Sequence, residues 1–241
     1  MSAVIDRPEL ATLLARLHAD SERELVERAQ ARFVGTATEF SRLLDEYRRL
    51  APRAQAALLR EHRLTRPEGE AADSGLSLAI SAATGEFLHN LVLLTGAEQV
   101  LELGSSRGVS TLYLASALRK LGRGRVTAIE SDPAKCEVLR EHLRLGGVDD
   151  FVHVYEGDLF DHLARLDDCY DVVFLDIFAD RYLDAFAEIE PRLRRGSVVV
   201  ADNMFSAETE LGAFRDYIRS RSRYSTTTVE AGSGLEFIVV A

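Results

Sequence analysis

The chain has 241 residues, which is enough for one α/β domain with an additional segment. Its net charge of −10 at pH 7 argues against a nucleic-acid partner, because phosphate binding requires a basic surface. No run approaches the roughly 20 apolar residues of a membrane span, and the first residues lack the basic and apolar stretches of a signal peptide. We therefore expect a cytoplasmic protein that engages neither nucleic acid nor a membrane.

The first quarter of the chain is predicted to be helical. Apolar residues recur at three- and four-residue steps between residues 8 and 63, and Pro8 and Pro52 each suit the first turn of a helix. A polar segment from Thr65 to Gly75 then predicts a loop or lid. We divide the chain into an N-terminal helical extension, residues 1–75, and a second domain, residues 76–241. We expect the extension to cover a ligand pocket and to form a homodimer face.

Strand and helix patterns alternate in the second domain. Short connections between them predict a mostly parallel sheet with right-handed crossovers and helices on both faces, and the turn AGSG predicts a closing antiparallel hairpin. The fold class is therefore α/β, with a Rossmann-like doubly wound sheet. The expected strands cover residues 99–103, 125–130, 151–156, 171–176, 197–202, 224–230 and 235–240. The expected helices cover residues 85–95, 106–121, 133–145, 159–166, 182–193 and 207–221.

The segment VLELGSSRGVSTLYLA, which starts at residue 100, carries the clearest binding signal. Glu102 lies near the end of a strand, and Gly104 and Gly108 form a turn that leads into a helix. Such a turn lets a ligand meet unpaired backbone N–H groups. The third glycine of a dinucleotide fingerprint is missing, and the charge of Glu102 disfavours a pyrophosphate. A nucleoside-like ligand is therefore favoured over the dinucleotide of an oxidoreductase.

Acidic residues also end three other predicted strands. Glu130, Asp176 and Asp202 lie where open α/β sheets bind their ligands. Glu130 is placed to accept both ribose hydroxyls of a nucleoside, and Asp158 to meet an adenine edge. Asp176, Asp202 and Asn203 offer oxygen ligands that suit Mg²⁺. The simpler alternative is that these side chains cap helices and form a turn.

A family resemblance rests on four motifs that occur in order with the correct spacing. The motifs are TGEFLHNLVLLTGAEQVLELGSSRGVSTLYLA, TAIESDP, VVFLDIFADRY and VVVADN, between residues 84 and 203. This segment resembles the class I S-adenosylmethionine-dependent methyltransferases. It is most similar to the cation-dependent O-methyltransferases of the catechol and caffeoyl-CoA type.

The resemblance implies methyl transfer from S-adenosyl-L-methionine to a hydroxyl of a small polyhydroxylated, catechol-like acceptor. It also implies dependence on Mg²⁺ or another divalent cation, held by Asp176, Asp202 and Asn203, with Asp176 in a catalytic role. The segment GLEFIVV resembles a substrate-binding segment of the family and implies a contact from Glu236. The implied cofactor-binding residues are Glu102, Gly104, Ser105, Gly108, Ser110, Glu130, Asp158, Leu159 and Phe178.

One position departs from the family pattern. The family places a lysine, the general base, three residues after the first metal-binding aspartate, and this chain has Ala179 there. Arg181 cannot replace it, because a guanidinium does not lose its proton at neutral pH. Asp180 and His89 are conceivable bases. The alternative is therefore a protein that binds S-adenosylmethionine but has altered or no O-methylation chemistry.

The two cysteines, Cys136 and Cys169, each lie in an apolar pattern and away from metal-ligand spacing. We expect both to be small core residues, and no disulfide framework is indicated.

Overall fold

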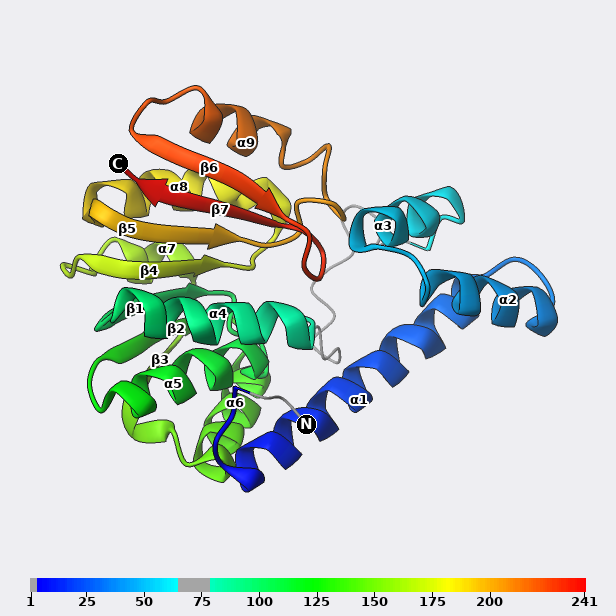
Figure 1. Ribbon diagram of the computed structural model, residues 1–241, viewed down its shortest axis with the longest axis horizontal. Coiled ribbons are helices and arrows are strands. Elements are labelled where there is room, and N and C mark those ends of the chain that lie inside the picture. Colours follow the sequence, from blue (N-terminus) through cyan, green and yellow to red (C-terminus); the bar gives the residue numbers. More distant parts are fainter. Residues whose placement is uncertain (1–3, 65–78) are drawn as a thin grey trace.

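The computed structural model describes residues 4–64 and 79–241. The predicted loop from Thr65 to Gly75 lies outside the described residues. The described part forms a seven-stranded sheet in the order β3-β2-β1-β4-β5-β7-β6, with helices on both faces (Figure 1). This arrangement confirms the predicted α/β fold class.

The first five strands of this order, from β3 to β5, run parallel, and β7 pairs antiparallel with both β5 and β6. The order reverses between β1 and β4, which creates the crevice where ligands of such sheets bind. The strands match the expected ranges to within one residue, except that β5 begins four residues early. Their bounds are β1 (Gln99–Leu103), β2 (Arg125–Glu130), β3 (Val152–Glu156), β4 (Tyr170–Leu175), β5 (Leu193–Ala201), β6 (Tyr224–Val229) and β7 (Leu235–Val240).

Each layer of helices covers one face of this sheet. The first layer consists of α4 (Ala82–Thr95), α5 (Val109–Leu121) and α6 (Pro133–Gly146). The second consists of α7 (Leu159–Leu163), α8 (Tyr182–Ile189) and α9 (Gly212–Arg219). Short 3₁₀ turns, η1 (Asp149–Phe151), η2 (Ala179–Arg181) and η3 (Glu190–Arg192), join several of these elements.

Local chemistry explains where the helices begin and end. The Asp132 side chain accepts the Ala134 N–H at 2.9 Å and caps α6, with proline at the first helical position, as predicted. Helix α8 ends at Ile189 rather than at residue 193, because Pro191 cannot donate to a continuing helix. Helix α9 begins five residues later than predicted. The residues before it form turns, in which Phe205 donates its N–H to the carbonyl of Ser233 at 2.8 Å.

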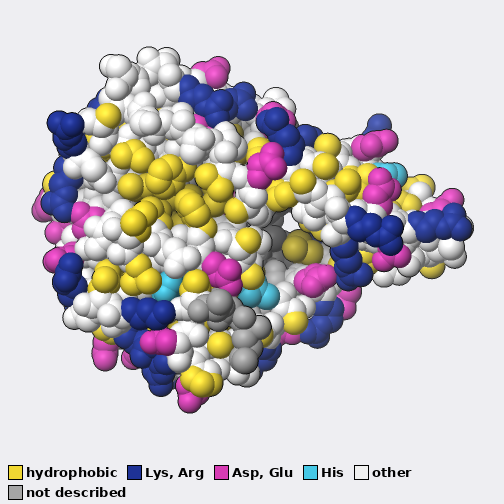
Figure 2. Space-filling view, viewed as in Figure 1, with side chains coloured by type: hydrophobic (Ala, Val, Ile, Leu, Met, Phe, Trp, Pro, Cys, Tyr) yellow, Lys and Arg dark blue, Asp and Glu magenta, His cyan; other side chains and the backbone are white. Residues whose placement is uncertain are grey.

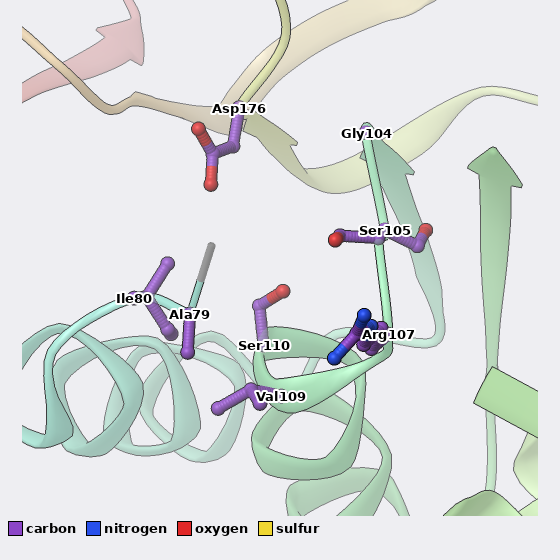
Figure 3. A pocket seen from close by; sticks show the side chains of 9 residues that line it. Ala79, Ile80, Gly104, Ser105, Arg107, Val109, Ser110 and Asp176 are labelled. Atoms are coloured by element: carbon purple, nitrogen blue, oxygen red, sulfur yellow. The ribbon is translucent and has the colours of Figure 1, made fainter. Parts of the chain in front are cut away.

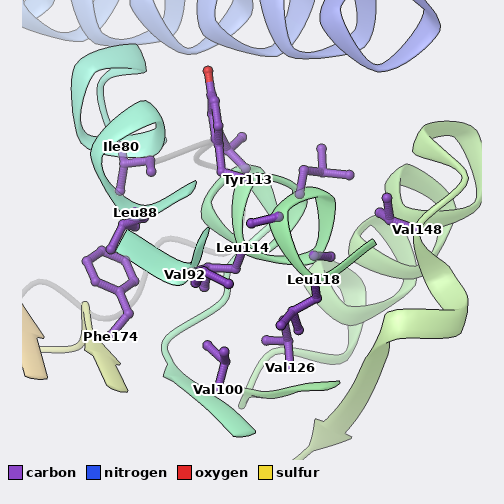
Figure 4. Close-up of a cluster of buried hydrophobic side chains, with 14 of the residues drawn as sticks. Ile80, Leu88, Val92, Val100, Tyr113, Leu114, Leu118, Val126, Val148 and Phe174 are labelled. Atoms are coloured by element: carbon purple, nitrogen blue, oxygen red, sulfur yellow. The ribbon is translucent and has the colours of Figure 1, made fainter. Parts of the chain in front are cut away.

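The core is divided by the sheet into two clusters of buried apolar side chains. The first lies under α4, α5 and α6 (Figure 4), and the second lies under α7, α8 and α9. In the first cluster Tyr113 reaches from α5 toward α1, and its hydroxyl lies 3.1 Å from Nε2 of His18. A Cβ atom on Gly85 would lie 2.3 Å from the Tyr113 ring, so only glycine lets α4 pack this closely. Helix α1 is thereby joined to the core of the second domain.

The N-terminal helices are α1 (Pro8–Arg32), α2 (Ala37–Tyr47) and α3 (Pro52–Glu61). One face of the first half of α1 is buried in the first cluster, whereas Leu25 in its second half is 48% exposed. We define the arm as residues 22–64, the part of this region that leaves the body of the protein. Figure 1 shows the arm beside the edge at which the parallel strands end. The division at residue 75 and the dimer face stay predictions.

The surface shows one feature that the sequence did not indicate. Hydrophobic side chains gather over the β5–β7 half of the sheet, beyond α4 (Figure 2). Phe237 and Val239 on β7 are only partly buried there, and the Phe237 ring packs edge-on against Phe87 at 5.9 Å. Cys136 is buried as expected, but Cys169 is exposed, because it lies in the turn before β4 rather than in the strand. No helix in the described residues is long and apolar enough to cross a membrane.

We predict that acid weakens the junction of α1, α4 and α5. Burial lowers the pKa of His18 below its usual 6.5, although the charge of Glu86 raises it. Below pH 6.5 the unfolded chain therefore binds more protons than the folded one, and the free energy of unfolding falls as the pH falls. His18→Gln keeps a polar partner for Tyr113 but does not titrate. Urea unfolding at pH 7 and pH 5 should show a smaller pH dependence in this variant, and equal dependence would contradict the assignment.

Candidate functional site

Four strands end at one row of the sheet. The row consists of one paired residue from each strand: Ile129 of β2, Leu103 of β1, Leu175 of β4 and Ala201 of β5. Parallel register therefore places the next residues side by side where the strands end, as predicted from the sequence. Those next residues are Glu130, Gly104, Asp176 and Asp202.

The glycine-rich turn packs directly against the end of β4. Gly104 and Gly108 have φ angles of +88° and +87°, and Ser106 has a φ of +46°. A Cβ atom on Gly104 would lie 2.0 Å from the carbonyl oxygen of Asp176. Both the conformation and the space therefore require glycine at this position. Gly108 is the N-cap residue of α5, so the turn leads straight into the helix.

Unpaired polar atoms surround this turn. Glu102 is fully buried and accepts a hydrogen bond from Oγ1 of Thr111 at 2.5 Å. Burial raises the pKa of Glu102, although hydroxyl groups nearby lower it. Within residues 4–64 and 79–241, Oε1 of Glu102 and the hydroxyls of Ser105 and Ser106 are buried without a hydrogen-bond partner. Buried polar atoms of this kind mark a place where a ligand can supply the partners.

Glu130 links the turn to the next helix. One of its oxygens accepts the Ser106 N–H at 2.8 Å, and the other accepts the Asp132 N–H at 2.9 Å. The side chain thus fixes the glycine-rich turn against the start of α6, which agrees with the capping interpretation. Oγ of Ser131 also donates to it, at 3.4 Å. A carboxylate has about four lone-pair positions, so these three bonds leave acceptor capacity for a ligand hydroxyl.

A small cavity lies at the mouth of the turn (Figure 3). Ser105, Ser110 and Asp176 contribute polar side chains to its wall, and Ala79 and Ile80 before α4 contribute apolar ones. In Figure 3 the Asp176 carboxylate faces the cavity from the β4 side, opposite the first turn of α5. The end of β4 therefore belongs to the same site as the glycine-rich turn.

Asp176, Asp202 and Asn203 form a second group of polar residues at this edge. Nδ2 of Asn203 donates to Oδ1 of Asp176 at 2.8 Å, and its backbone N–H donates to Oδ1 of Asp202 at 2.6 Å. Asn203 has a φ of +68°, which is uncommon for a residue other than glycine. The three predicted metal ligands are thus brought together, in a turn held by their own hydrogen bonds.

The two aspartates repel each other. The pKa of Asp176 is raised to about 6, mainly by burial. A hydrogen bond from Asn203 opposes this increase, and the negative charge of Glu102 adds to it. Burial and the charge of Asp176 raise the pKa of Asp202 well above its usual value. A buried carboxylate that repels a half-buried one favours a shared proton or a cation between them.

The donor set fits a hard divalent cation, which prefers carboxylate and amide oxygens. Oδ1 of Asn203 now accepts from Oγ of Ser206 at 3.1 Å, so the amide would have to turn by half a rotation to present oxygen to a cation beside Asp176. No cluster of three His, Cys, Asp or Glu side chains that could hold a metal occurs in the described part of the chain. The site therefore depends on two carboxylates and one amide.

Comparison with known proteins assigns the family. The family described as a methyltransferase domain matches residues 101–204. The "Putative O-methyltransferase" of Mycolicibacterium vanbaalenii is 30% identical over 171 residues, which are 65% of this chain and 75% of that protein. This chain belongs to the S-adenosylmethionine-dependent O-methyltransferase family.

Two further relatives are similar in sequence or structure. Catechol O-methyltransferase of Mycobacterium tuberculosis is 38% identical over 129 residues, covering 53% of this chain and 57% of that protein. The O-methyltransferase TomG of Streptomyces achromogenes, solved in complex with S-adenosylmethionine, has a TM-score of 0.63 at 25% identity. That match covers 83% of this chain and 96% of TomG. The chain spans only 55% to 62% of the catechol O-methyltransferases that it matches.

Tyr182 supports the candidate site from below, and the sequence did not reveal it. Its buried hydroxyl lies 3.1 Å from the carbonyl of Leu175 and 3.2 Å from that of Asp202. It thereby joins the ends of β4 and β5 underneath the aspartates. A tyrosine at the start of an apolar helix is usually a core residue, so its spacing carried no signal.

Of the nine predicted cofactor residues, Gly104, Ser105 and Ser110 line the cavity. Glu102, Gly108 and Glu130 form or support the glycine-rich turn, and the other three do neither. Asp158 is the N-cap of α7, where it accepts the Phe160 N–H at 2.8 Å and lies 3.8 Å from Arg181. Leu159 packs in the second core cluster. Phe178 is 45% exposed just beyond β4. Their contacts with a cofactor stay predictions.

Glu236 is not brought to the cavity. It is fully buried opposite Ala201, and both of its oxygens accept hydrogen bonds from Arg219 at 2.8 and 2.9 Å. Oγ1 of Thr228 donates to it as well, at 2.8 Å. The buried Glu236 carboxylate therefore forms an ion pair with the half-exposed Arg219 that fastens α9 to β7. Its predicted substrate contact stays untested.

The structure also narrows the search for a general base. His89 is fully buried between α4 and α5, with Nδ1 2.8 Å from Oγ of Ser116, and burial lowers its pKa. This histidine is a core residue and cannot reach an acceptor. Ala179 packs against the second core cluster, so the position at which the family has lysine is partly apolar here.

We predict that Gly104→Ala unfolds the site. The Asp176 carbonyl must move to admit the new methyl group, which adds roughly 1–3 kcal/mol of overpacking to the cost of a positive φ. Gly196→Ala is the matched control, because Gly196 has the same φ of +88° and no atom within 4 Å. Denaturant unfolding should show a larger loss of stability for Gly104→Ala. Equal losses would show that the close approach to Asp176 contributes nothing.

Proposed function

We propose that this protein transfers a methyl group from S-adenosylmethionine to a hydroxyl of a small acceptor with vicinal, catechol-like hydroxyls, with the aid of Mg²⁺ or another divalent cation. The observation that carries this proposal is the position of Asp176. Its carboxylate faces the cavity at the glycine-rich turn and also accepts a hydrogen bond from Asn203. One side chain thus joins the candidate cofactor pocket to the candidate cation site.

The cofactor half of the site is assigned to the glycine-rich turn and its neighbours. The unpaired Oε1 of Glu102 and hydroxyl of Ser105 are suited to hydrogen-bond donors and acceptors of the amino-acid end of S-adenosylmethionine. Glu130 is suited to the ribose hydroxyls. The negative charge of Glu102 also matches a cationic cofactor. The similarity to the O-methyltransferase TomG, solved in complex with S-adenosylmethionine, supports this assignment.

The acceptor half is assigned to Asp176, Asp202 and Asn203, which would hold the cation. A bound divalent cation lowers the pKa of a coordinated hydroxyl and orients it. Tyr182 keeps the two aspartates adjacent by bridging the strand ends from below. The protein itself then has only to bind S-adenosylmethionine and the acceptor and to orient them for methyl transfer.

The absence of a lysine at position 179 restricts the acceptor. Arg181 cannot accept a proton, and His89 is enclosed in the core. A phenolic hydroxyl, with a pKa of about 10 in the tyrosine side chain, needs far less help to ionise than an aliphatic alcohol. We therefore favour an aromatic diol. The names of the catechol O-methyltransferases agree with this choice.

The alternative is a protein that binds S-adenosylmethionine but does not carry out this O-methylation. Ala179 is the observation that favours it, because the family's base is replaced by a methyl group packed on the second core. Turnover of any vicinal diol would reject this alternative. Binding of the cofactor without turnover of such acceptors would support it.

The cofactor assignment predicts that S-adenosylmethionine and its demethylated product both bind. Glu130→Ala should weaken binding at least about tenfold, since it removes charge-assisted hydrogen bonds to the ribose hydroxyls and frees the Ser106 N–H. Glu137→Ala is the matched control, because Glu137 is an exposed residue of α6. Isothermal titration calorimetry measures both variants. No binding to the unaltered protein would reject the proposed function.

The cation assignment predicts that turnover of a catechol needs Asp202. Asp202→Asn should lower kcat/KM by more than about 100-fold, since changes to outer-shell partners of metals alone cost 10- to 100-fold. Asp184→Asn, an exposed aspartate on α8, serves as the control. Chelation should abolish turnover, and added Mg²⁺ should restore it. Activity that survives both chelation and Asp202→Asn would remove the cation from the mechanism.

A further inference from the structure

The arm contacts the body at the segment that follows the candidate cation site. Nη1 of Arg60, on α3, donates to the carbonyl of Phe205 at 2.5 Å. The Arg53 guanidinium lies 5.1 Å from the centre of the Phe205 ring. Both arginines also approach Glu208, at 3.7 Å for Arg60 and 3.4 Å for Arg53. Helix α3 thus contacts the turn of residues 203–208 through two arginine side chains, Arg53 and Arg60.

The other side of the same turn is held by the β6–β7 connection. Met204 donates its N–H to the carbonyl of Gly234 at 3.0 Å, and Phe205 donates to that of Ser233 at 2.8 Å. The Phe205 ring packs onto Gly234, where a Cβ atom would lie 2.6 Å from it. The turn is therefore clamped between α3 and the closing hairpin.

This clamp bears on Asn203, the first residue of the turn. Its φ of +68° is a conformation that persists only where the surroundings impose it. The Ala207 N–H, at 2.9 Å, and Oγ of Ser206, at 3.3 Å, both donate to the carbonyl of Asn203. The carbonyl of Phe205, which Arg60 holds, lies inside this hydrogen-bonded turn. Arg60 is therefore connected to Asn203 through this turn, without direct contact.

We propose that α3 is a latch, in which Arg60 and Arg53 hold the turn of residues 203–208 in the conformation that presents Asn203 to Asp176. Docking of the arm and formation of the cation site are then coupled. Arg60 is a positioning residue in this scheme, since it acts through the Phe205 carbonyl. Its effect on the cation rests on the proposed function, whereas its effect on the turn does not.

The latch predicts a local change in Arg60→Ala. Hydrogen exchange of the Met204 and Ala207 amides should accelerate by about fivefold or more, the lower end of typical coupling between sites. The strand amides of β4 and β5 should not change. Arg60→Lys, which keeps one donor for the Phe205 carbonyl, should restore part of the protection. Arg49→Ala is the control, because Arg49 is an exposed residue of the arm.

Binding measurements on the same full-length variants test the coupling. Mn²⁺ binding, followed by electron paramagnetic resonance, should weaken about fivefold or more in Arg60→Ala, while binding of the demethylated cofactor should not change. Unaltered exchange of the turn in Arg60→Ala overturns the latch. Unaltered Mn²⁺ affinity despite faster exchange overturns the coupling. An unaltered protein that binds no Mn²⁺ overturns the cation site as well, so the failures can be told apart.

Discussion

The register of four parallel strands is the constraint on which the site depends. Because Ile129, Leu103, Leu175 and Ala201 share one row, the residues after them emerge at the same edge of the sheet. The close approach of Gly104 to the Asp176 carbonyl joins the two halves of this edge. A slip of one residue in any of these strands would turn its side chains to the opposite face and move its terminal acid. The buried apolar residues of both core clusters specify that register.

The acidic residues at this edge are unfavourable on their own. Burial raises the pKa values of Glu102, Asp176 and Asp202, so each carboxylate is held in a place that disfavours its charge. Partial compensation comes from Thr111 for Glu102, and from Asn203 for the two aspartates. Sites that bind cationic ligands commonly keep such uncompensated charge, because the ligand supplies the missing partner. A sulfonium cofactor and a divalent cation both fit this requirement.

The sequence predicted those features that local chemistry determines. The strand positions, the proline-led helices and the helix cap at Asp132 follow from periodicity and capping rules. The convergence of Asp176, Asp202 and Asn203 follows from the strand order. Cys169 was misjudged, because it lies in the loop before β4, and Tyr182 was missed, because its partners are carbonyl groups at the ends of two strands. The ion pair of Glu236 was not anticipated either, and its substrate contact stays a prediction. Arg219 of α9 donates to Glu236 of β7, and the sequence around residue 236 does not indicate that an arginine will lie there. Acceptor and arm contacts are likewise long-range, so a single sequence cannot supply them.

Helix α1 packs into the first core cluster with its first half and belongs to the arm with its second half. The helix therefore connects the core to the candidate site. Its first half is packed in the first cluster, where Tyr113 meets His18. A little further along, Oγ of Ser21 accepts the N–H of Ala79, a residue of the cavity wall, at 3.3 Å. Its second half carries α2 and α3 to the turn of residues 203–208. The position of α3 is therefore set at one end by the core and at the other by Arg60 and Arg53. The boundary at residue 75 stays a prediction, and across it the first half of α1 packs into the same core cluster as α4, α5 and α6.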